Sequence, residues 1–229
     1  MARQTLSTLH IYGNMSFIGV KGAERLDAND PALGLIIAQE QAMEMLGQGT
    51  GMSEIKRATG WETGVDGKWR YEIADPFHAS AEIEDHVKRH YGETLAIRYC
   101  LRDLSLLVAY PAFERLKLFA LYSRTSKCAG YFNPTNYCMM VSMGTQSSPF
   151  EYQIEGILLH EVQHLIQEEE NFARGGDASL GRRRYMRLAG EVEARNVCDR
   201  HSLSPEQRRA MLRSATQDIP DAEQIIVYK

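Results

Sequence analysis

The chain has 229 residues, of which 44% are hydrophobic and 24% charged, a balance typical of a globular domain and not of a disordered chain. Its formal net charge of −4 and the absence of any apolar stretch of roughly 20 residues give no reason to expect nucleic acid or a membrane as a partner. The N-terminus lacks a signal-peptide pattern, so we expect a cytoplasmic protein, and four cysteines without a C-x-x-C pair argue against a cysteine zinc site.

Two helices and a strand are predicted in the first third of the chain. A helix is expected from Pro31 to Leu46, because Asp30 is a favourable N-cap ahead of a proline, and a shorter helix is expected at 53–58. Residues 66–67 are Asp-Gly, a strong tight-turn signal, and apolar side chains alternate with polar ones at 69–73. This alternation predicts a strand after the turn.

Short strands and one helix are predicted in the middle of the chain. The polar stretch 76–95 is expected to form a loop and a short helix, and 101–109 a helix that ends before a proline. The apolar run from Leu116 to Tyr122 favours a buried strand. Residues 129–132 and 137–143 flank an Asn-Pro-Thr-Asn turn, which predicts that they pair as a hairpin.

The segment His160-Glu161-Val162-Gln163-His164 carries the strongest chemical signal. Apolar residues recur around it at helical spacing and predict a helix with a buried face: Ile154, Ile157, Leu158 and Leu165. Residues four apart lie on one helix face, so His160 and His164 present two imidazoles to the same point. Two such ligands suit Zn²⁺, and Glu161 is placed to take a proton from a water that the metal activates.

A catalytic zinc site needs a third protein ligand, which a second helix can supply. We predict a helix from Arg183 to Arg200, and the Gly175-Gly176 loop before it lets it return antiparallel to the first. Glu191 and Glu193 lie about 200° apart around this helix, so only one faces the metal. Apolar neighbours three positions before and after favour Glu191. Glu193 is interpreted as a solvated surface residue or as a support behind the ligands.

Other candidate ligands fit less well. His201 lies past the expected end of the helix, and Cys198 is better explained as a small buried residue. Four more histidines lie in polar context and are interpreted as ordinary surface residues: His10, His78, His86 and His90. The basic run from Arg182 to Arg184, with Arg187, is interpreted as a solvated helix start and not as a phosphate site.

Several segments match a known family in the same order along the chain. The longest are Leu158 to Gln167, Asn171 to Gly176 and Leu188 to Asn196, and shorter ones lie upstream at 59–61, 66–73 and 110–111. From Phe17 to its end the chain resembles the zincin-like large polyvalent protein-associated domain, which occurs in phages and mobile elements. The spacing of the ligands also resembles that of the wider gluzincins.

The resemblance implies an α+β fold with a zincin-like core, consisting of a small mixed sheet, an HExxH helix and a second ligand-bearing helix, plus a helical N-terminal region. Residues 1–100 are expected to form this N-terminal helical and hairpin region, packed on a core at 101–229. In gluzincins a glutamate followed three residues later by alanine is the third ligand, which corresponds to Glu191. The usual acidic or amide residue after that alanine is replaced by Arg195, with Asn196 next.

The function implied is that of a zinc metallopeptidase acting on a protein or peptide substrate. His160, His164 and Glu191 are then the zinc ligands, and Glu161 is the general base. The tetrahedral oxyanion needs a second electrophile, for which Tyr185 is the candidate, although a core tyrosine is the alternative interpretation.

Three questions stay open at the level of sequence. The chain could be a non-catalytic phage structural or adaptor protein, although a structural zinc site does not need Glu161 and usually has four protein ligands. The same ligands also support hydrolysis of bonds other than peptide bonds. The strand at 137–143 is predicted to be either an exposed sheet edge that aligns the substrate or a strand paired on both sides. The sequence does not indicate an oligomeric state.

Overall fold

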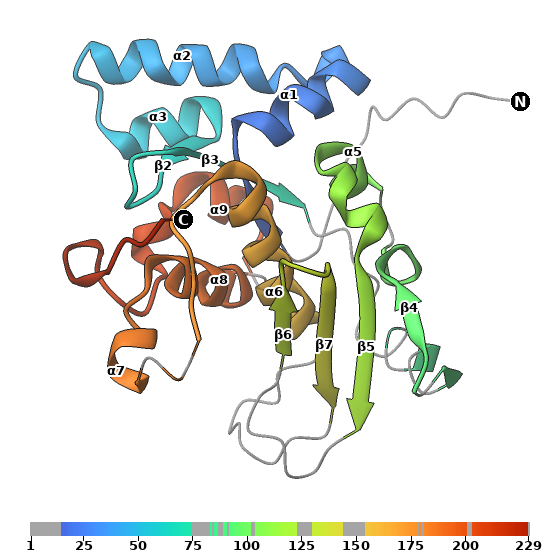
Figure 1. Ribbon diagram of the computed structural model, residues 1–229. Helices are drawn as coiled ribbons and strands as arrows, with labels where there is room; N and C mark the ends of the chain where they lie inside the picture. The colour runs from blue at the N-terminus through green and yellow to red at the C-terminus, as the bar shows by residue number, and fades with distance from the viewer. Residues whose placement is uncertain are drawn as a thin grey trace, which may run out of the picture.

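The computed structural model describes residues 15–74, 83, 85–86, 89–90, 92–101, 104–122, 130–143, 154–177, 179, 181–200 and 203–228. Within these residues the protein combines helices with two small sheets, so the α+β class expected from the sequence is confirmed. Figure 1 shows α1, α2 and α3 at one end of the molecule, the larger sheet at the other, and α6 and α8 between them.

The N-terminal part forms a helical layer beside a three-stranded antiparallel sheet. The helices are α1 (Val20–Asn29), α2 (Leu35–Gly47) and α3 (Met52–Thr59), with a 3₁₀ turn at Pro31–Leu33. The strands are β1 (Met15–Ile18), β2 (Trp61–Thr63) and β3 (Trp69–Ala74), in the order β1-β3-β2. The strand predicted after the Asp-Gly turn is therefore confirmed as β3.

The helix predicted from Pro31 to Leu46 is confirmed as α2 only from Leu35 onward, and its predicted first turn is a separate 3₁₀ turn. Asp30 does act as a cap, because its side chain accepts a hydrogen bond from the N–H of Ala32, but it caps only the 3₁₀ turn. Gly34 then adopts a left-handed conformation with φ of 61°, which ends that turn and starts α2 separately.

A four-stranded mixed sheet follows in the order β4-β5-β7-β6. Its strands are β4 (Thr94–Ala96), β5 (Lys117–Tyr122), β6 (Gly130–Asn133) and β7 (Cys138–Met143), with β5 and β7 parallel and the other pairs antiparallel. The predicted hairpin is confirmed as β6 and β7. Of the two alternatives for 137–143, the exposed edge is wrong and the strand paired on both sides is confirmed, because β7 pairs with β5 on one side and with β6 on the other.

Short helical segments surround the start of this sheet. The helix expected at 101–109 is shorter, because α5 spans Ser105–Ala109, and 3₁₀ turns lie at Ile97–Cys100 and Pro111–Arg115. Of the stretch 76–95, where a loop and short helix are predicted, residues 76–82, 84, 87–88 and 91 lie outside the described residues.

Helix α6 (Ile154–Glu170) occupies the centre of the molecule and contacts α8, β1, β6 and β7. Its apolar side chains belong to a continuous core that runs from Phe17 in β1 to Val197 in α8. None of the described helices combines the length and the apolar character needed to cross a membrane.

The helix predicted from Arg183 to Arg200 is in fact two helices, α7 (Arg182–Tyr185) and α8 (Ala189–Arg200). The C-terminal segment interrupts it, because the N–H of Ile225 donates to the carbonyl of Arg187 at 2.7 Å and the carbonyl of Ile225 accepts from the N–H of Ala189 at 2.9 Å. Near the C-terminus, residues 224–228 contribute only one parallel bridge, between Ile225 and Leu188. Ser204 begins the next helix, α9 (Pro205–Ala210), with a capping box.

Candidate metal centre

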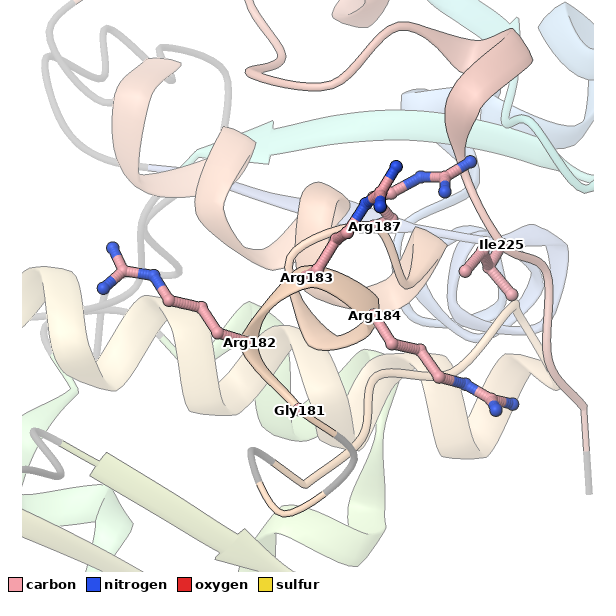
Figure 2. Close-up of a pocket in the computed structure, with 6 residues that line it drawn as sticks. All are labelled: Gly181, Arg182, Arg183, Arg184, Arg187 and Ile225. Carbon is pink, nitrogen blue, oxygen red and sulfur yellow. The ribbon is translucent and has the colours of Figure 1, made fainter.

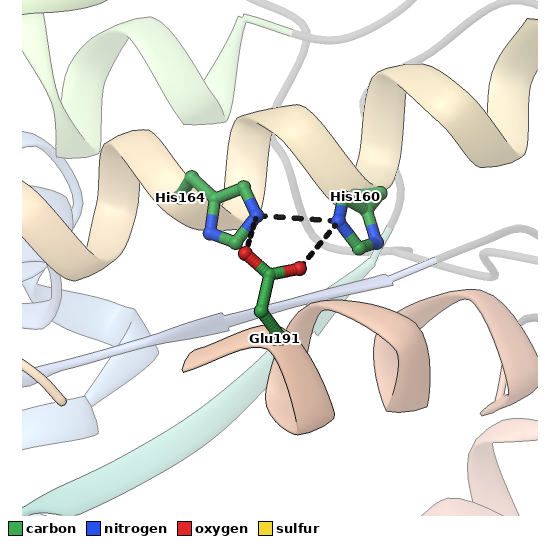
Figure 3. Close-up of side chains that lie close together, drawn as sticks. All are labelled: His160, His164 and Glu191. Carbon is green, nitrogen blue, oxygen red and sulfur yellow. Dashed lines mark hydrogen bonds and ion pairs between the residues drawn. The ribbon is translucent and has the colours of Figure 1, made fainter. Parts of the chain in front are cut away.

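Two imidazoles on α6 form one side of the candidate site. His160 and His164 lie one turn apart on the same face of the helix, and their Nε2 atoms are 3.2 Å apart (Figure 3). Both side chains are partly buried, with 18% and 17% of their surface exposed. The four-residue spacing therefore brings the two nitrogens to one point at the molecular surface.

The third side chain comes from the first turn of α8. The Glu191 carboxylate points at both imidazoles, with 3.4 Å from Oε2 to His160 Nε2 and 3.4 Å from Oε1 to His164 Nε2 (Figure 3). One ligand atom from each of these three residues lies within 4.8 Å of the others, which is a group that could hold a metal ion. Helix α8 turns only one of its two glutamates toward this point.

Charge and burial around Glu191 fit a cation. Burial alone would raise the pKa of Glu191, but the imidazoles of His164 and His160 lower it well below its ordinary value. The pKa of His164 responds in the opposite sense: burial lowers it, yet the Glu191 carboxylate raises it to about 9. Among the described residues, Glu191 Oε2 is buried without a hydrogen bond of good geometry. A buried carboxylate oxygen in this state favours an additional positive ligand.

The glycine-rich loop after α6 fixes the other carboxylate oxygen. The N–H of Gly176 donates to Glu191 Oε1 at 2.9 Å. A side chain at Gly175 would meet this same oxygen, because its Cβ would lie 2.3 Å away. The sequence analysis interpreted this loop only as the connection that lets the second helix return antiparallel to the first. In the structure the loop is also part of the site.

Gly190 lets α8 approach this loop, and we expect its replacement to be costly. A Cβ at Gly190 would lie 2.1 Å from the backbone nitrogen of Gly175, so Gly190→Ala should lower the free energy of unfolding by about 1–3 kcal/mol. Gly47→Ala is the matched control, because no atom lies within 4 Å of its Cβ, and it should be neutral or stabilising by about 0.5–1 kcal/mol. Urea unfolding of both variants measures the difference, and equal stabilities would contradict the close approach.

Glu161 lies beside the three side chains and is 6% exposed. Burial raises the pKa of Glu161, and the Glu191 carboxylate adds to this, whereas the two imidazoles and the N–H of Phe132 in β6 lower it. Room for the carboxylate depends on Gly130 in β6, since a Cβ there would lie 2.5 Å from Glu161 Oε1. Strand β6, and not β7, is therefore the strand that borders the site.

Tyr185 ends α7 close to the same group. It is partly exposed, and its pKa is raised by burial and by contact with the Glu191 carboxylate. The structure thus places this hydroxyl next to the candidate ligand and outside the fully buried core. Arg195, which the sequence left without a clear role, is directed elsewhere: it pairs with Asp218 and donates to the carbonyl of Met186.

Glu193 is not the solvated surface residue that the sequence favoured. It is 8% exposed, and its carboxylate pairs with Arg70 of β3 at 2.8 Å. Cys198 is buried, as expected, and its thiol donates to the carbonyl of Gly156. His201, His78 and His10 lie outside the described residues.

Two glutamines of α6 were missed as parts of the site. Gln167 Oε1 lies 2.9 Å from His164 Nδ1, and the side chain of Gln163 contacts Glu193 at 3.0 Å. The available signal was the polar character of two positions on a helix face that is otherwise apolar. A polar residue at such a position needs a buried partner.

The arginines of α7 line a separate surface pocket. Arg182, Arg183 and Arg184 are exposed, and with Gly181, Arg187 and Ile225 they border a pocket of about 530 Å³ (Figure 2). Figure 2 shows their side chains spreading in different directions from the helix, so they do not converge on one point. None of the three candidate ligands borders this pocket.

Comparisons with known proteins find a match only for the N-terminal part of the chain. No curated protein and no solved structure matches the chain. The candidate ligands all lie after residue 159, outside the one segment for which a family was found. Residues 15–79, which include both layers of the N-terminal part, match the family model of the large polyvalent protein associated domain 23.

Proposed function

We propose that the protein is a zinc-dependent metallopeptidase that hydrolyses a peptide bond of a protein substrate. The observation that carries the proposal is the convergence of His160, His164 and Glu191 from two helices, with the Glu161 carboxylate beside them. The match of residues 15–79 to a large polyvalent protein associated domain supports a role in phage or mobile-element biology.

The donor set fits a catalytic zinc ion better than a structural one. Two histidines and one glutamate are a ligand set of catalytic zinc sites, which leave a position open, whereas structural sites are usually closed by four protein ligands. Glu191 Oε2 has no well-placed donor within the described residues and is available as the carboxylate ligand. When bound there, zinc lowers the pKa of a water and polarises the substrate carbonyl.

Glu161 supplies the proton transfer in this proposal. Its raised pKa makes it a better base than an ordinary surface glutamate, and it lies next to the two imidazoles. It takes a proton from the attacking water and later gives it to the leaving amine. Tyr185, beside Glu191, is the side chain positioned to donate to the developing oxyanion.

Strand β6 is the element that fits an extended substrate. It lies at the edge of the sheet as the described strands are ordered, and its residue Phe132 borders Glu161. An edge strand can pair with the backbone of a peptide and align it independently of its side chains. In this role β6 replaces β7, whose two edges are both paired with neighbouring strands.

The proposal predicts close to one zinc ion per chain in the purified protein. His160→Ala and His164→Ala should each abolish stoichiometric binding, because two remaining ligands hold zinc poorly. His90→Ala, which changes a partly exposed histidine paired with Glu93, is the control and should keep the metal. Metal analysis of the four proteins tests this.

Two outcomes would separate the proposal from its rivals. A wild-type protein that takes up no zinc, even when zinc is added, would contradict the metal site itself. A protein that binds one zinc but cleaves no member of a peptide library would contradict the peptidase and favour either the non-catalytic scaffold or hydrolysis of another kind of bond.

A further inference from the structure

A buried chain of polar contacts connects the N-terminal sheet to His164. Arg70 of β3 donates from Nε to Glu193 Oε2 at 2.8 Å, and both side chains are almost fully buried. The other oxygen of Glu193 accepts from Gln163 Nε2 at 3.0 Å and from Gln167 Nε2 at 3.2 Å. Gln167 Oε1 then lies 2.9 Å from His164 Nδ1.

The orientation of the Gln167 amide follows from its partners. Its Nε2 faces the Glu193 carboxylate and the carbonyl of Gly190, which is 2.9 Å away. Both partners are acceptors only, so the NH₂ group of Gln167 must point to them. Its carbonyl oxygen must therefore face His164, and the amide cannot be turned over without placing oxygen against oxygen.

This orientation determines which nitrogen of His164 carries hydrogen. An amide oxygen accepts and cannot donate, so Nδ1 of His164 must be the N–H. In the neutral ring Nε2 then keeps its lone pair, and Nε2 is the atom directed at His160 and Glu191. The ring is thereby fixed in the form that a metal ligand requires.

Gln163 anchors the same chain to β1. Its amide exchanges two hydrogen bonds with the backbone of Phe17, accepting at 3.0 Å and donating at 3.1 Å, while Nε2 also donates to Glu193. Asp66, the second partner of Arg70, accepts from the N–H of Ala173 at 2.8 Å and so contacts the loop that leads to Gly176. The segment 15–74 thus supports both sides of the site.

We propose that Glu193, paired with Arg70, is a positioning residue that orients Gln167 and thereby holds His164 with its hydrogen on Nδ1 and with Nε2 available to the metal. This inference rests on the proposed metal site. It gives the N-terminal segment a specific task in that site, beyond packing on the core.

The test reads the tautomer of His164 directly by ¹⁵N NMR of histidine-labelled, metal-free protein, with the pH raised until the ring signals show the neutral form. The wild-type protein should show hydrogen on Nδ1 alone. Gln167→Met removes the acceptor at nearly constant size, and Glu193→Gln replaces one of the two acceptors that orient the amide, leaving only the Gly190 carbonyl. Each should convert the signal to a mixture or to hydrogen on Nε2. Zinc affinity at pH 7 should fall about 10- to 100-fold.

Glu62→Gln is the matched control. Glu62 is even more deeply buried than Glu193 and is also paired with a cation, Lys56, but it accepts from the N–H of Arg213 and not from the residues around His164. This variant should lose stability without changing the tautomer, and its zinc affinity should stay within about twofold of wild type. A role of Glu193 in stability alone would give the same result for both glutamates.

The outcomes distinguish this inference from the proposed function. Hydrogen on Nε2 in the wild-type protein overturns the inference even if no variant folds. Unchanged tautomer and zinc affinity in the folded variants also overturn it, while leaving the metal site in place. The expected tautomer changes in a protein that never binds zinc would support the inference and contradict the proposed function.

Discussion

Glu161→Gln is expected to lower peptide hydrolysis roughly 10²- to 10⁴-fold while zinc stays bound, because a positioned general base contributes about that much to the rate. The amide has the shape of the carboxylate and can still accept from the N–H of Phe132, but it cannot take a proton from water. The buried position of the side chain, 6% exposed, means that bulk water cannot easily replace it. Turnover of a cleaved peptide and metal content of the same sample are the two measurements.

A second glutamate of α6 provides the control for this experiment. Glu169→Gln makes the same chemical change on the same helix, at a residue whose contact is with Tyr137 and not with the candidate ligands. It should keep full activity. Zinc-dependent activity retained in Glu161→Gln would rule out its role as the base, whereas loss of zinc from this variant would make it a structural support of the site.

Local patterns predicted several elements of this protein correctly. The spacing around His160 correctly implied helical structure over 154–170, and the turn signal before Tyr137 correctly implied the hairpin of β6 and β7. These features depend on residues within a few positions of one another, so they can be recognised in a single sequence.

Features that depend on distant parts of the chain were not predictable in this way. Helix α7 is separated from α8 because Ile225 pairs with Arg187 and Ala189, and the interior position of β7 results from parallel pairing with β5. Neither partner is indicated by the local sequence. The burial of Glu193 has the same origin, because its cation, Arg70, lies 123 residues earlier.

The candidate site contains both kinds of feature, those that local sequence predicts and those that depend on distant contacts. Helical geometry predicted that Glu191 and Glu193 face different ways, and the structure directs Glu191 to the imidazoles and Glu193 to Arg70. What the second glutamate does could not be predicted, since a charged residue at a helix position is most often solvated. Only the tertiary contacts of Gln163 and Gln167 indicate its role.

Replacing the two glutamates of α8 separately should give very different zinc affinities. Glu191→Gln removes a carboxylate that lies 3.4 Å from both imidazoles, so we expect zinc affinity to fall by more than roughly 100-fold, beyond the range typical of residues behind the ligands. For Glu193→Gln we expect zinc affinity to fall by only about 10- to 100-fold, because its effect passes through Gln167 and His164. Competition with a chelating dye measures both affinities.

The direct ligand can also be identified independently of affinity. An anomalous-scattering map of zinc-loaded crystals locates the ion, which should lie between His160, His164 and Glu191. An ion held by Glu193, His201 or Cys198 would overturn the assignment of the third ligand. An equal loss of affinity in Glu191→Gln and Glu193→Gln, with the ion still at Glu191, would instead mean that orienting His164 matters to zinc binding as much as the carboxylate ligand itself.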